Sequence, residues 1–224
     1  MREMNNQIVV ATLDGRSYYK IIKFLKSLRL SYKELSPLEA INSNTKIIIT
    51  SQKESAIFKK KNIIIDSELS ENPLIIKAKI LRNLMKPYMY DQLIIGIDPG
   101  KRIGISIFYL YDEIESIVLT CIGCVLDLIS KILAGIAARR KIVRIGDGNI
   151  SMANSIAIHI KTKFNFVDVE IVDEHGTSSH MNAERNRRII KDKSSARLIA
   201  FRNGKIFDPE LKSLKKEHNK IVKI

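Results

Sequence analysis

The fold is decided by one stretch of the chain, residues 93–106, which reads LIIGIDPGKRIGIS. Its apolar run from Leu93 to Ile97 predicts a buried strand that ends in a carboxylate, Asp98. Pro99-Gly100 then predicts a tight turn, because proline presets φ and glycine accepts positive φ. A second apolar run, Ile103 to Tyr109, follows at once, so we expect it to be the antiparallel partner strand.

Asp98 at the inner edge of this hairpin is a candidate ligand for a divalent cation. Gly96 and Gly104 flank it on the two expected strands, and a glycine inside a strand leaves room for backbone or ligand to approach closely. The alternative is a polar hairpin turn with no further role, since Asp-Pro-Gly turns are common. The two glycines favour the functional interpretation.

The hydrophobic-Gly-hydrophobic-Asp-Pro-Gly pattern, followed by a short strand, resembles the first motif of the RNase H-like superfamily, and most closely its RuvC and YqgF (Holliday junction resolvase-like) branch. The resemblance covers about residues 92–203. Three antiparallel strands followed by αβαβα are the element order of an RNase H-like domain, and the same order is predicted here. The expected strands are 93–97, 103–109, 113–121, 141–146 and 167–172, and the expected helices are 125–138, 151–163 and about 193–202.

The resemblance implies a metal site made of carboxylates at the ends of the first and fourth strands and on the last helix. Asp98, Asp147 and Asp192 stand at these three places. Two Mg²⁺ or Mn²⁺ ions about 4 Å apart need three or four convergent oxygens. Two of these residues also have a structural alternative. Asp147 would then belong to a turn that precedes Ser151 as the N-cap of the next helix, and Asp192 would be a favourable negative charge at the N-terminus of the last helix.

Two side motifs of the family are present in altered form. YqgF-like proteins end their fifth strand in Asp-Glu-Arg-hydrophobic-Thr/Ser-Thr, whereas residues 173–179 read DEHGTSS here, with His175 in place of the arginine. RuvC carries two aspartates three residues apart in its last helix, and Ser195 stands where the second would be. That missing oxygen ligand leaves Glu174 as the fourth expected catalytic and metal-binding residue, with a solvated strand end as the alternative for Asp173-Glu174.

The charge balance favours a polyanionic partner. The chain of 224 residues has a formal net charge of +14 and a pI near 9.7, and neutralising phosphates with Lys and Arg is the main source of nucleic-acid affinity. A general bias towards lysine is the alternative at the level of composition. The residues expected to contact nucleic acid are Lys101, Arg102, Thr177, Ser178, Arg185, Arg187, Arg188, Lys191 and Lys193. A solvated basic helix is the alternative for the arginine-rich part.

Residues 1–90 predict a separate small α/β domain of Rossmann or receiver-like kind, ahead of the RNase H-like domain at 91–203 and a basic tail at 204–224. Strands are expected at 8–13, 31–35, 46–50 and 63–65, helices at 18–28 and 73–85, and a break at Pro37. The strands lack polar alternation, so we expect a parallel sheet covered on both faces. No phosphate-binding glycine loop is present in this part.

The remaining features set limits on location and redox chemistry. No signal peptide or apolar run of membrane-spanning length is present, which predicts a soluble cytoplasmic protein without a membrane partner. Cys121 and Cys124 form one Cys-x-x-Cys pair, too few ligands for a zinc site. A redox pair at a helix start is one interpretation, but the neighbouring Ile and Val residues favour small core residues.

These observations predict a metal-dependent nuclease or resolvase-like phosphodiesterase that acts on structured DNA or RNA. The alternative is an RNase H-like module that has lost efficient catalysis and binds nucleic acid or a protein partner. An ATP-using relative of this superfamily is disfavoured, because Gly146-Asp147-Gly148 is too short to hold a triphosphate. The choice between DNA and RNA stays open, and a homodimer is one candidate assembly.

Overall fold

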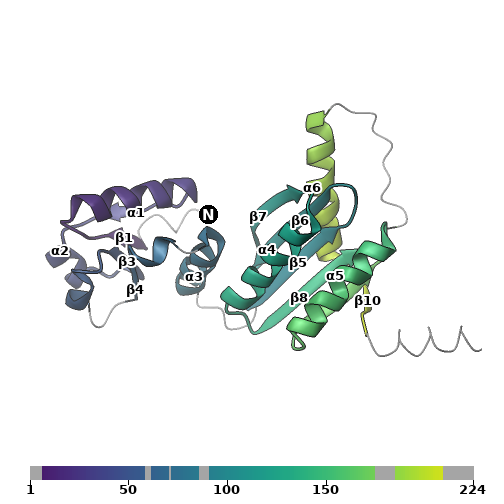
Figure 1. Cartoon of the computed structure of the whole chain (residues 1–224). Helices are drawn as coiled ribbons and strands as arrows, with labels where there is room; N and C mark the ends of the chain where they lie inside the picture. The colour runs from purple at the N-terminus through teal and green to yellow at the C-terminus, as the bar shows by residue number, and fades with distance from the viewer. Residues whose placement is uncertain (1–6, 59–61, 71, 86–90, 175–184, 209–224) are drawn as a thin grey trace, which may run out of the picture. The chain divides into compact units, whose positions relative to one another are not determined.

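The computed structural model describes residues 7–58, 62–70, 72–85, 91–174 and 185–208, with the side chains of residues 185–191 left outside the description. The chain divides into two compact units, residues 1–89 and 90–224 (Figure 1). Each unit has its own β-sheet and its own helices, so the architecture is mixed α/β. Within the described ranges, every helix is too short or too polar to cross a bilayer.

The N-terminal unit is a four-stranded parallel sheet in the order β2-β1-β3-β4. One face packs under α1 and α3 through Ile21, Leu25, Ile76 and Ile80, and the other face packs Val9 and Ile48 against Ala40 and Phe58. The expected sheet with two covered faces is therefore present. Its elements are β1 (Ile8–Val10), α1 (Gly15–Ser27), β2 (Lys33–Glu34), α2 (Pro37–Asn42), β3 (Ile47–Thr50), η2 (Ser55–Phe58), β4 (Ile63–Ile65), η3 (Glu68–Ser70) and α3 (Pro73–Met85).

The main difference from the sequence prediction in this unit is at Pro37. The break expected there is instead the first residue of helix α2, where proline is tolerated because its missing N–H has no helical partner. Ser36 caps this helix, and its backbone N–H donates to the Glu39 carboxylate at 2.9 Å. The capping box therefore explains the helix, and its Ser-x-x-Glu spacing is visible in the sequence.

The C-terminal unit is a six-stranded mixed sheet in the order β10-β9-β8-β5-β6-β7. β5, β6 and β7 form an antiparallel meander, and β8 and β9 run parallel to β5 on its other side. The elements are β5 (Gln92–Asp98), β6 (Ile103–Tyr109), β7 (Asp112–Leu119), α4 (Ile122–Gly135), β8 (Arg140–Gly146), α5 (Ile150–Lys163), β9 (Asp168–Val172), α6 (Arg185–Phe201) and β10 (Lys205–Ile206).

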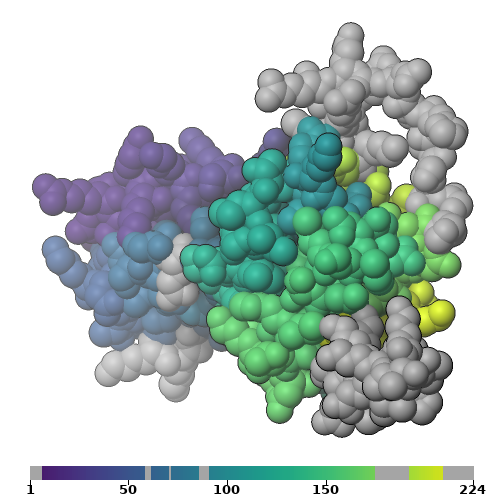
Figure 2. Space-filling view, turned by 45° about the vertical axis from the view of Figure 1, so that its right-hand side comes forward, coloured from purple at the N-terminus to yellow at the C-terminus, as the bar shows by residue number. Residues whose placement is uncertain are grey.

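Helices cover both faces of this sheet (Figure 1). α4 and α5 pack against each other on one face, with α4 against β7 and α5 against β8 and β9. In the space-filling view the teal and green residues of these two helices lie next to each other at the surface (Figure 2). α6 crosses the other face, over β5, β6, β7 and β8.

Two glycines let α6 lie directly on the strands. A Cβ at Gly96 would collide with the backbone carbonyl of Ala196 and lie 2.7 Å from the Cβ of Ala200. A Cβ at Gly104 would lie 2.9 Å from the carbonyl carbon of Asp192. Real Cβ atoms do not approach this closely, so both positions require glycine. The glycines that flank Asp98 therefore hold the helix that carries Asp192.

The C-terminal unit differs from the sequence prediction at its end. The last helix was expected at about residues 193–202, but α6 begins at Arg185, so Asp192 lies within the helix rather than near its start. The basic tail was expected from residue 204, yet β10 at Lys205–Ile206 pairs antiparallel with β9. Lys205 and Ile206 are both exposed, and such a short edge strand has no apolar periodicity to reveal it.

Candidate functional site

The candidate site lies at the edge of the sheet where the parallel strands β5, β8 and β9 end. Ile97 pairs with Ile145, and Gly146 pairs with Val172, so these three strands end at matching levels. Asp98 is the last residue of β5, while Asp147 and Glu174 follow β8 and β9. The carboxyl ends of adjacent parallel strands are a common place for ligand sites, and this edge gathers three of the predicted carboxylates.

Asp147 and Glu174 are in direct contact. The backbone N–H of Glu174 donates to Oδ1 of Asp147 at 3.0 Å, and the backbone N–H of Gly148 donates to Oε1 of Glu174 at 3.2 Å. A Cβ at Gly146 would lie 2.6 Å from Cδ of Glu174, and a Cβ at Gly148 would lie 2.9 Å from its Oε2. The two glycines therefore form a cradle for one carboxylate, beside a second carboxylate.

The electrostatics of this pair disfavour the ionised form of Glu174. Burial is the main cause that raises the pKa of Glu174, and the negative charge of Asp147 raises it further. The hydrogen bond from Gly148 and the positive charge of Arg202 oppose this shift. A carboxylate pushed towards its neutral form by burial, with a second carboxylate adding to the shift, is common in functional sites, and a bound cation would relieve the repulsion.

Asp192 reaches the same edge from α6. Its backbone lies against Gly104, which is paired with Asp98 across the β5–β6 hairpin. Its Oδ2 is 2.7 Å from Nη2 of Arg102. Oδ2 is a buried oxygen that this ion pair, instead of a hydrogen bond, compensates. An orphaned carboxylate oxygen costs free energy unless a charged partner compensates it, and here that partner is Arg102.

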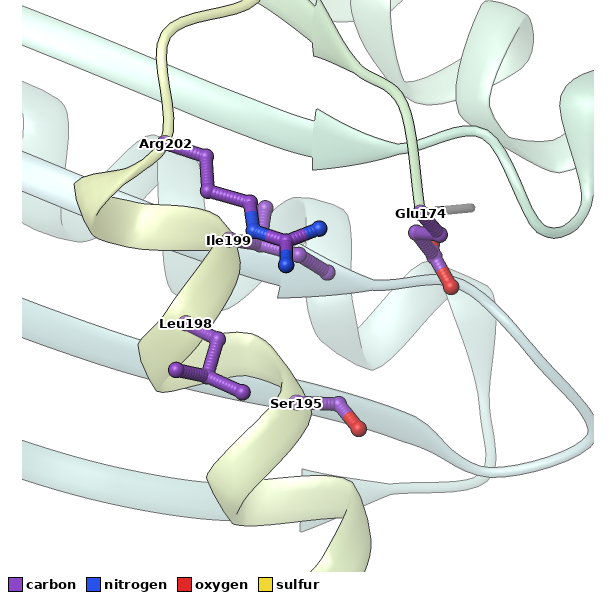
Figure 3. A pocket seen from close by; sticks show the side chains of 5 residues that line it. All are labelled: Glu174, Ser195, Leu198, Ile199 and Arg202. Carbon is purple, nitrogen blue, oxygen red and sulfur yellow. The ribbon is translucent and has the colours of Figure 1, made fainter. Parts of the chain in front are cut away.

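A small cavity lies between Glu174 and α6 (Figure 3). Ser195, Leu198, Ile199 and Arg202 line its helix side, and Glu174 lines the opposite side. Ser195 lies three residues after Asp192, and Ile199 lies seven residues after it. All three therefore lie on one stripe of the helix. Ser195 therefore shares a cavity with Glu174.

The predicted carboxylates are brought to one edge but do not form one cluster. Within the described part of the chain, no three His, Cys, Asp or Glu side chains are close enough to share a metal ion. The expected convergence of Asp98, Asp147 and Asp192 on shared ions is therefore not found in this arrangement. In the arrangement present, Arg102 pairs with Asp192, and Asp147 accepts the backbone N–H of Glu174.

The predicted nucleic-acid contacts fall into three groups. Lys101 is exposed in the turn after Asp98, and Lys193 is half-buried on α6 beside Asp192. Arg102 is engaged by Asp192, which makes it part of the carboxylate site. The side chains of Arg185, Arg187, Arg188 and Lys191 on α6 lie outside the described residues, as do His175, Gly176, Thr177 and Ser178.

Sequence inspection missed the part that Arg202 plays in this site. Its guanidinium donates from Nη1 to the backbone carbonyl of Asp173 at 3.3 Å and lines the cavity opposite Glu174. Arg202 follows Ser195 by seven residues and stands at the end of the helix expected at about 193–202, so the stripe through Asp192 and Ser195 would have indicated it. Gly146 and Gly148 were noted in the sequence only as too short a phosphate loop, whereas they support Glu174.

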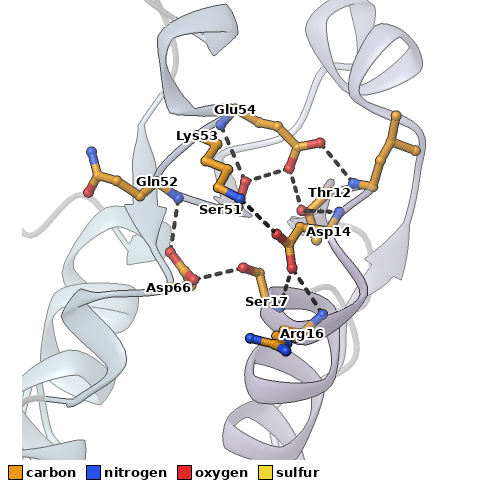
Figure 4. Close-up of polar contacts among 10 residues, drawn as sticks. Thr12, Asp14, Arg16, Ser17, Ser51, Gln52, Lys53, Glu54 and Asp66 are labelled. Carbon is orange, nitrogen blue, oxygen red and sulfur yellow. Dashed lines mark hydrogen bonds and ion pairs between the residues drawn. The ribbon is translucent and has the colours of Figure 1, made fainter.

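The N-terminal sheet has a polar cluster at the corresponding edge, where β1 and β3 end (Figure 4). Glu54 accepts hydrogen bonds from the hydroxyls of Thr12 and Ser51 and, at 2.8 Å, from the backbone N–H of Leu13. Burial tends to raise the pKa of Glu54, but these hydrogen bonds outweigh it and lower the pKa overall. Glu54 is therefore satisfied by its own neighbours.

Asp66 and Asp14 complete this N-terminal cluster in the same manner. Asp66 accepts the Ser17 hydroxyl at 2.8 Å and the Gln52 backbone N–H at 2.9 Å, and its pKa is lowered by these bonds although burial opposes the shift. Asp14 caps α1 by accepting the N–H of Ser17, which lowers its pKa. The carboxylates at this edge hold the local structure together.

Comparison with known proteins identifies part of the N-terminal unit. The family of response regulator receiver-like domains matches residues 7–73, which is less than a third of the chain. No curated protein matches the chain at a significant level. The parallel sheet with helices on both faces agrees with that match, so the N-terminal unit carries a receiver-like domain.

Proposed function

We propose that the C-terminal unit is an RNase H-like domain of the RuvC/YqgF kind that cleaves phosphodiester bonds of nucleic acid with Mg²⁺ or Mn²⁺. One observation carries the proposal. Asp98, Asp147 and Glu174 follow three neighbouring parallel strands, and the helix seated on Gly96 and Gly104 brings Asp192 to the same edge. The element order, β5-β6-β7-α4-β8-α5-β9-α6, is the order that the resemblance in sequence implies.

The donor set is suited to a hard divalent cation. Mg²⁺ is usually held by one or two carboxylates together with the phosphates of the substrate, so a complete protein cage is not needed in advance. Asp147 and Glu174 offer adjacent carboxylates, and Asp192 reaches the same edge with its Oδ2 paired to Arg102. When bound, such a cation would polarise the phosphodiester and lower the pKa of a bound water.

The side chains around the carboxylates have roles of their own in this proposal. Arg102 neutralises Asp192 in the free protein and would have to release it for Asp192 to act as a ligand. The exposed Lys101 beside it is placed to contact a phosphate of the nucleic-acid backbone. The net charge of +14 supports a polyanionic substrate, since each neutralised phosphate adds to binding through counterion release.

A second candidate function is a nucleic-acid-binding module of the same fold with little or no catalysis. Ser195 favours it, because the side chain that faces Glu174 across the cavity is a hydroxyl instead of a carboxylate. The Arg102–Asp192 ion pair favours the binding module as well, because the guanidinium of Arg102 already balances the negative charge of Asp192, which a metal ion would balance in a nuclease. Both candidates predict salt-dependent binding to nucleic acid, so binding alone does not separate them.

The experiment that tests the proposal measures cleavage and binding in parallel. Four-way DNA junctions, duplex DNA, single-stranded RNA and RNA hairpins are incubated with the full chain and Mg²⁺, Mn²⁺ or EDTA. Asp98→Asn should abolish metal-dependent cleavage and leave binding within about twofold, because an isosteric amide removes one charge at the site. Asp112→Asn is the matched control, since Asp112 is an exposed carboxylate at the opposite end of the same sheet.

The two candidates give different results in this experiment. Metal-dependent cleavage that Asp98→Asn removes and Asp112→Asn retains supports the nuclease. Nucleic-acid binding without cleavage of any substrate overturns the nuclease and supports the binding module. An absence of both binding and cleavage overturns both, and would show that the basic charge serves another purpose.

A further inference from the structure

The Cys-x-x-Cys pair lies at the start of α4, at the same edge of the sheet as the carboxylates. Cys121 follows β7, whose last residue, Leu119, pairs with Ile103 beside the turn that carries Asp98. The two cysteines play no part in the function proposed above. They are the only cysteines in the 224-residue sequence.

The expectation that these cysteines are small core residues is wrong. Residues 121–124 are all exposed, and both cysteines are free. The buried side of α4 begins only at Val125, which is 0% exposed, and continues through Ile129, Ile132 and Leu133. Val125 belongs to that inner side of the helix, whereas the first turn, with the apolar Ile122 in it, faces solvent. Both thiols are therefore accessible to a reactant.

The geometry couples the two thiols. Cys121 is the N-cap of α4, and its Sγ accepts the backbone N–H of Cys124 at 3.4 Å. Cys121 at the N-cap and Cys124 in the first turn are three residues apart on one helix, so both side chains emerge from neighbouring positions of the same element.

The helix start makes the two thiols unequal. The backbone N–H of Cys124 is the main cause that lowers the pKa of Cys121, and the Cys124 side chain adds to this effect. The pKa of Cys124 is raised, chiefly because its thiol hydrogen-bonds to Cys121. Asp127, the charged group that faces the pair, raises both slightly. Cys121 is thus the better nucleophile at neutral pH, since the thiolate is the reactive form.

We propose that Cys121 and Cys124 form a redox-active dithiol that exchanges with low-molecular-weight disulfides, with Cys121 as the attacking residue. This site is independent of the proposed nuclease activity. A Cys-x-x-Cys pair that is exposed, free and set at a helix start differs from a structural disulfide and from a four-ligand zinc site. Exchange with small disulfides is the chemistry that this arrangement best fits.

The exchange proceeds in two balanced steps. The Cys121 thiolate attacks one sulfur of the disulfide RSSR, whose S–S bond breaks, and one RS⁻ leaves and takes up a proton as RSH. Cys124 then loses its thiol proton and attacks Sγ of Cys121 in the mixed disulfide, which expels the second RSH. The net reaction oxidises the protein dithiol to one disulfide and reduces RSSR to two RSH, so the two electrons are balanced.

The test uses the reduced full chain with oxidised glutathione, followed by alkylation and intact-mass measurement. The wild type should lose two hydrogens and resist alkylation at both cysteines. Cys124→Ser should hold one glutathione on Cys121, because no second thiol is present to release it. Cys121→Ser should form its mixed disulfide roughly fivefold more slowly at pH 7, since the remaining Cys124 lacks the N-cap position at which a thiolate accepts the backbone N–H of residue 124.

Controls keep this test decisive. Serine is itself a good N-cap, so Cys121→Ser should retain α4, and the thermal midpoint of each variant confirms that the fold is intact. Two glutathiones on the wild type, or two thiols that stay open to alkylation, would overturn the proposal. Equal rates for the two single variants would overturn the assignment of Cys121 as the attacking residue.

Discussion

The two sheets of this chain end in polar edges that are built in opposite ways. At the N-terminal edge, Glu54 and Asp66 receive hydrogen bonds from hydroxyls and backbone N–H groups, and their pKa values are lowered. At the C-terminal edge, Glu174 lies beside Asp147 and its pKa is raised, chiefly by burial. Carboxylates satisfied by their own neighbours stabilise a fold, whereas a carboxylate that burial and a second carboxylate disfavour is available for a ligand.

The largest expected effect separates the two edges by activity. Under the proposed function, Asp147→Asn should lower metal-dependent cleavage by roughly 10³-fold, because a ligating carboxylate contributes several kcal/mol to the stabilisation of the transition state. Glu54→Gln should leave the cleavage rate nearly unchanged. Single-turnover rates at saturating Mg²⁺ measure both. A comparable loss in the two variants would show that the N-terminal edge also takes part in the reaction.

The next largest effect concerns the contact of α6 with strand β5. Gly96→Ala should destabilise the C-terminal unit by about 3 kcal/mol, because its Cβ would meet the backbone of Ala196 and the Cβ of Ala200, which cannot both move away. Gly15→Ala in the N-terminal unit is the matched control, since nothing lies within 4 Å of the new methyl. Denaturant unfolding of both variants checks this. A small effect at Gly96 would mean that α6 is not held against β5.

An intermediate effect tests the satisfied N-terminal edge. Glu54→Ala should destabilise the N-terminal unit by about 2 kcal/mol at neutral pH, because Thr12, Leu13 and Ser51 lose a charged acceptor. Since the pKa of Glu54 is lowered in the fold, its contribution is present above the ordinary value of 4.5 and is lost as the pH falls below it. Thermal unfolding from pH 7 down to pH 3 should therefore show the two proteins converging in acid.

The smallest effect concerns Glu174 and has the opposite sign. Glu174→Gln should stabilise the C-terminal unit by up to about 0.5 kcal/mol at pH 7, after allowance for solvent screening, because it removes a negative charge that the fold disfavours. The glutamine side chain keeps an oxygen that can accept the backbone N–H of Gly148. Because the folded pKa is raised, the wild type loses stability as the pH rises above the ordinary value of 4.5. The gain of the variant should therefore vanish below that pH. Unfolding midpoints of both proteins between pH 4 and pH 7 measure this difference in stability. A variant less stable than the wild type at pH 7 would contradict the conclusion that burial and Asp147 disfavour the ionised form of Glu174.

The sequence alone determined much of the C-terminal unit, because its strands are long apolar runs. β6 was predicted with its observed bounds, and β5 and β8 within one residue at each end, since each run is bounded by a polar residue or a turn. The start of α6 was missed by eight residues because its N-terminal part is densely charged and carries no apolar stripe. Apolar periodicity reveals only the part of a helix that packs against the rest of the protein.

The tertiary structure decided how the candidate carboxylates are used. Position in the sequence placed Asp98, Asp147, Glu174 and Asp192 at strand ends and on the last helix, but it did not reveal that Arg102 pairs with Asp192. It also did not distinguish exposed from buried cysteines, because of their apolar neighbours Val125 is buried on the inner face of α4 while Ile122 is exposed. Pairing of side chains and exposure of a helix turn depend on segments far apart in the chain, which local sequence patterns do not encode.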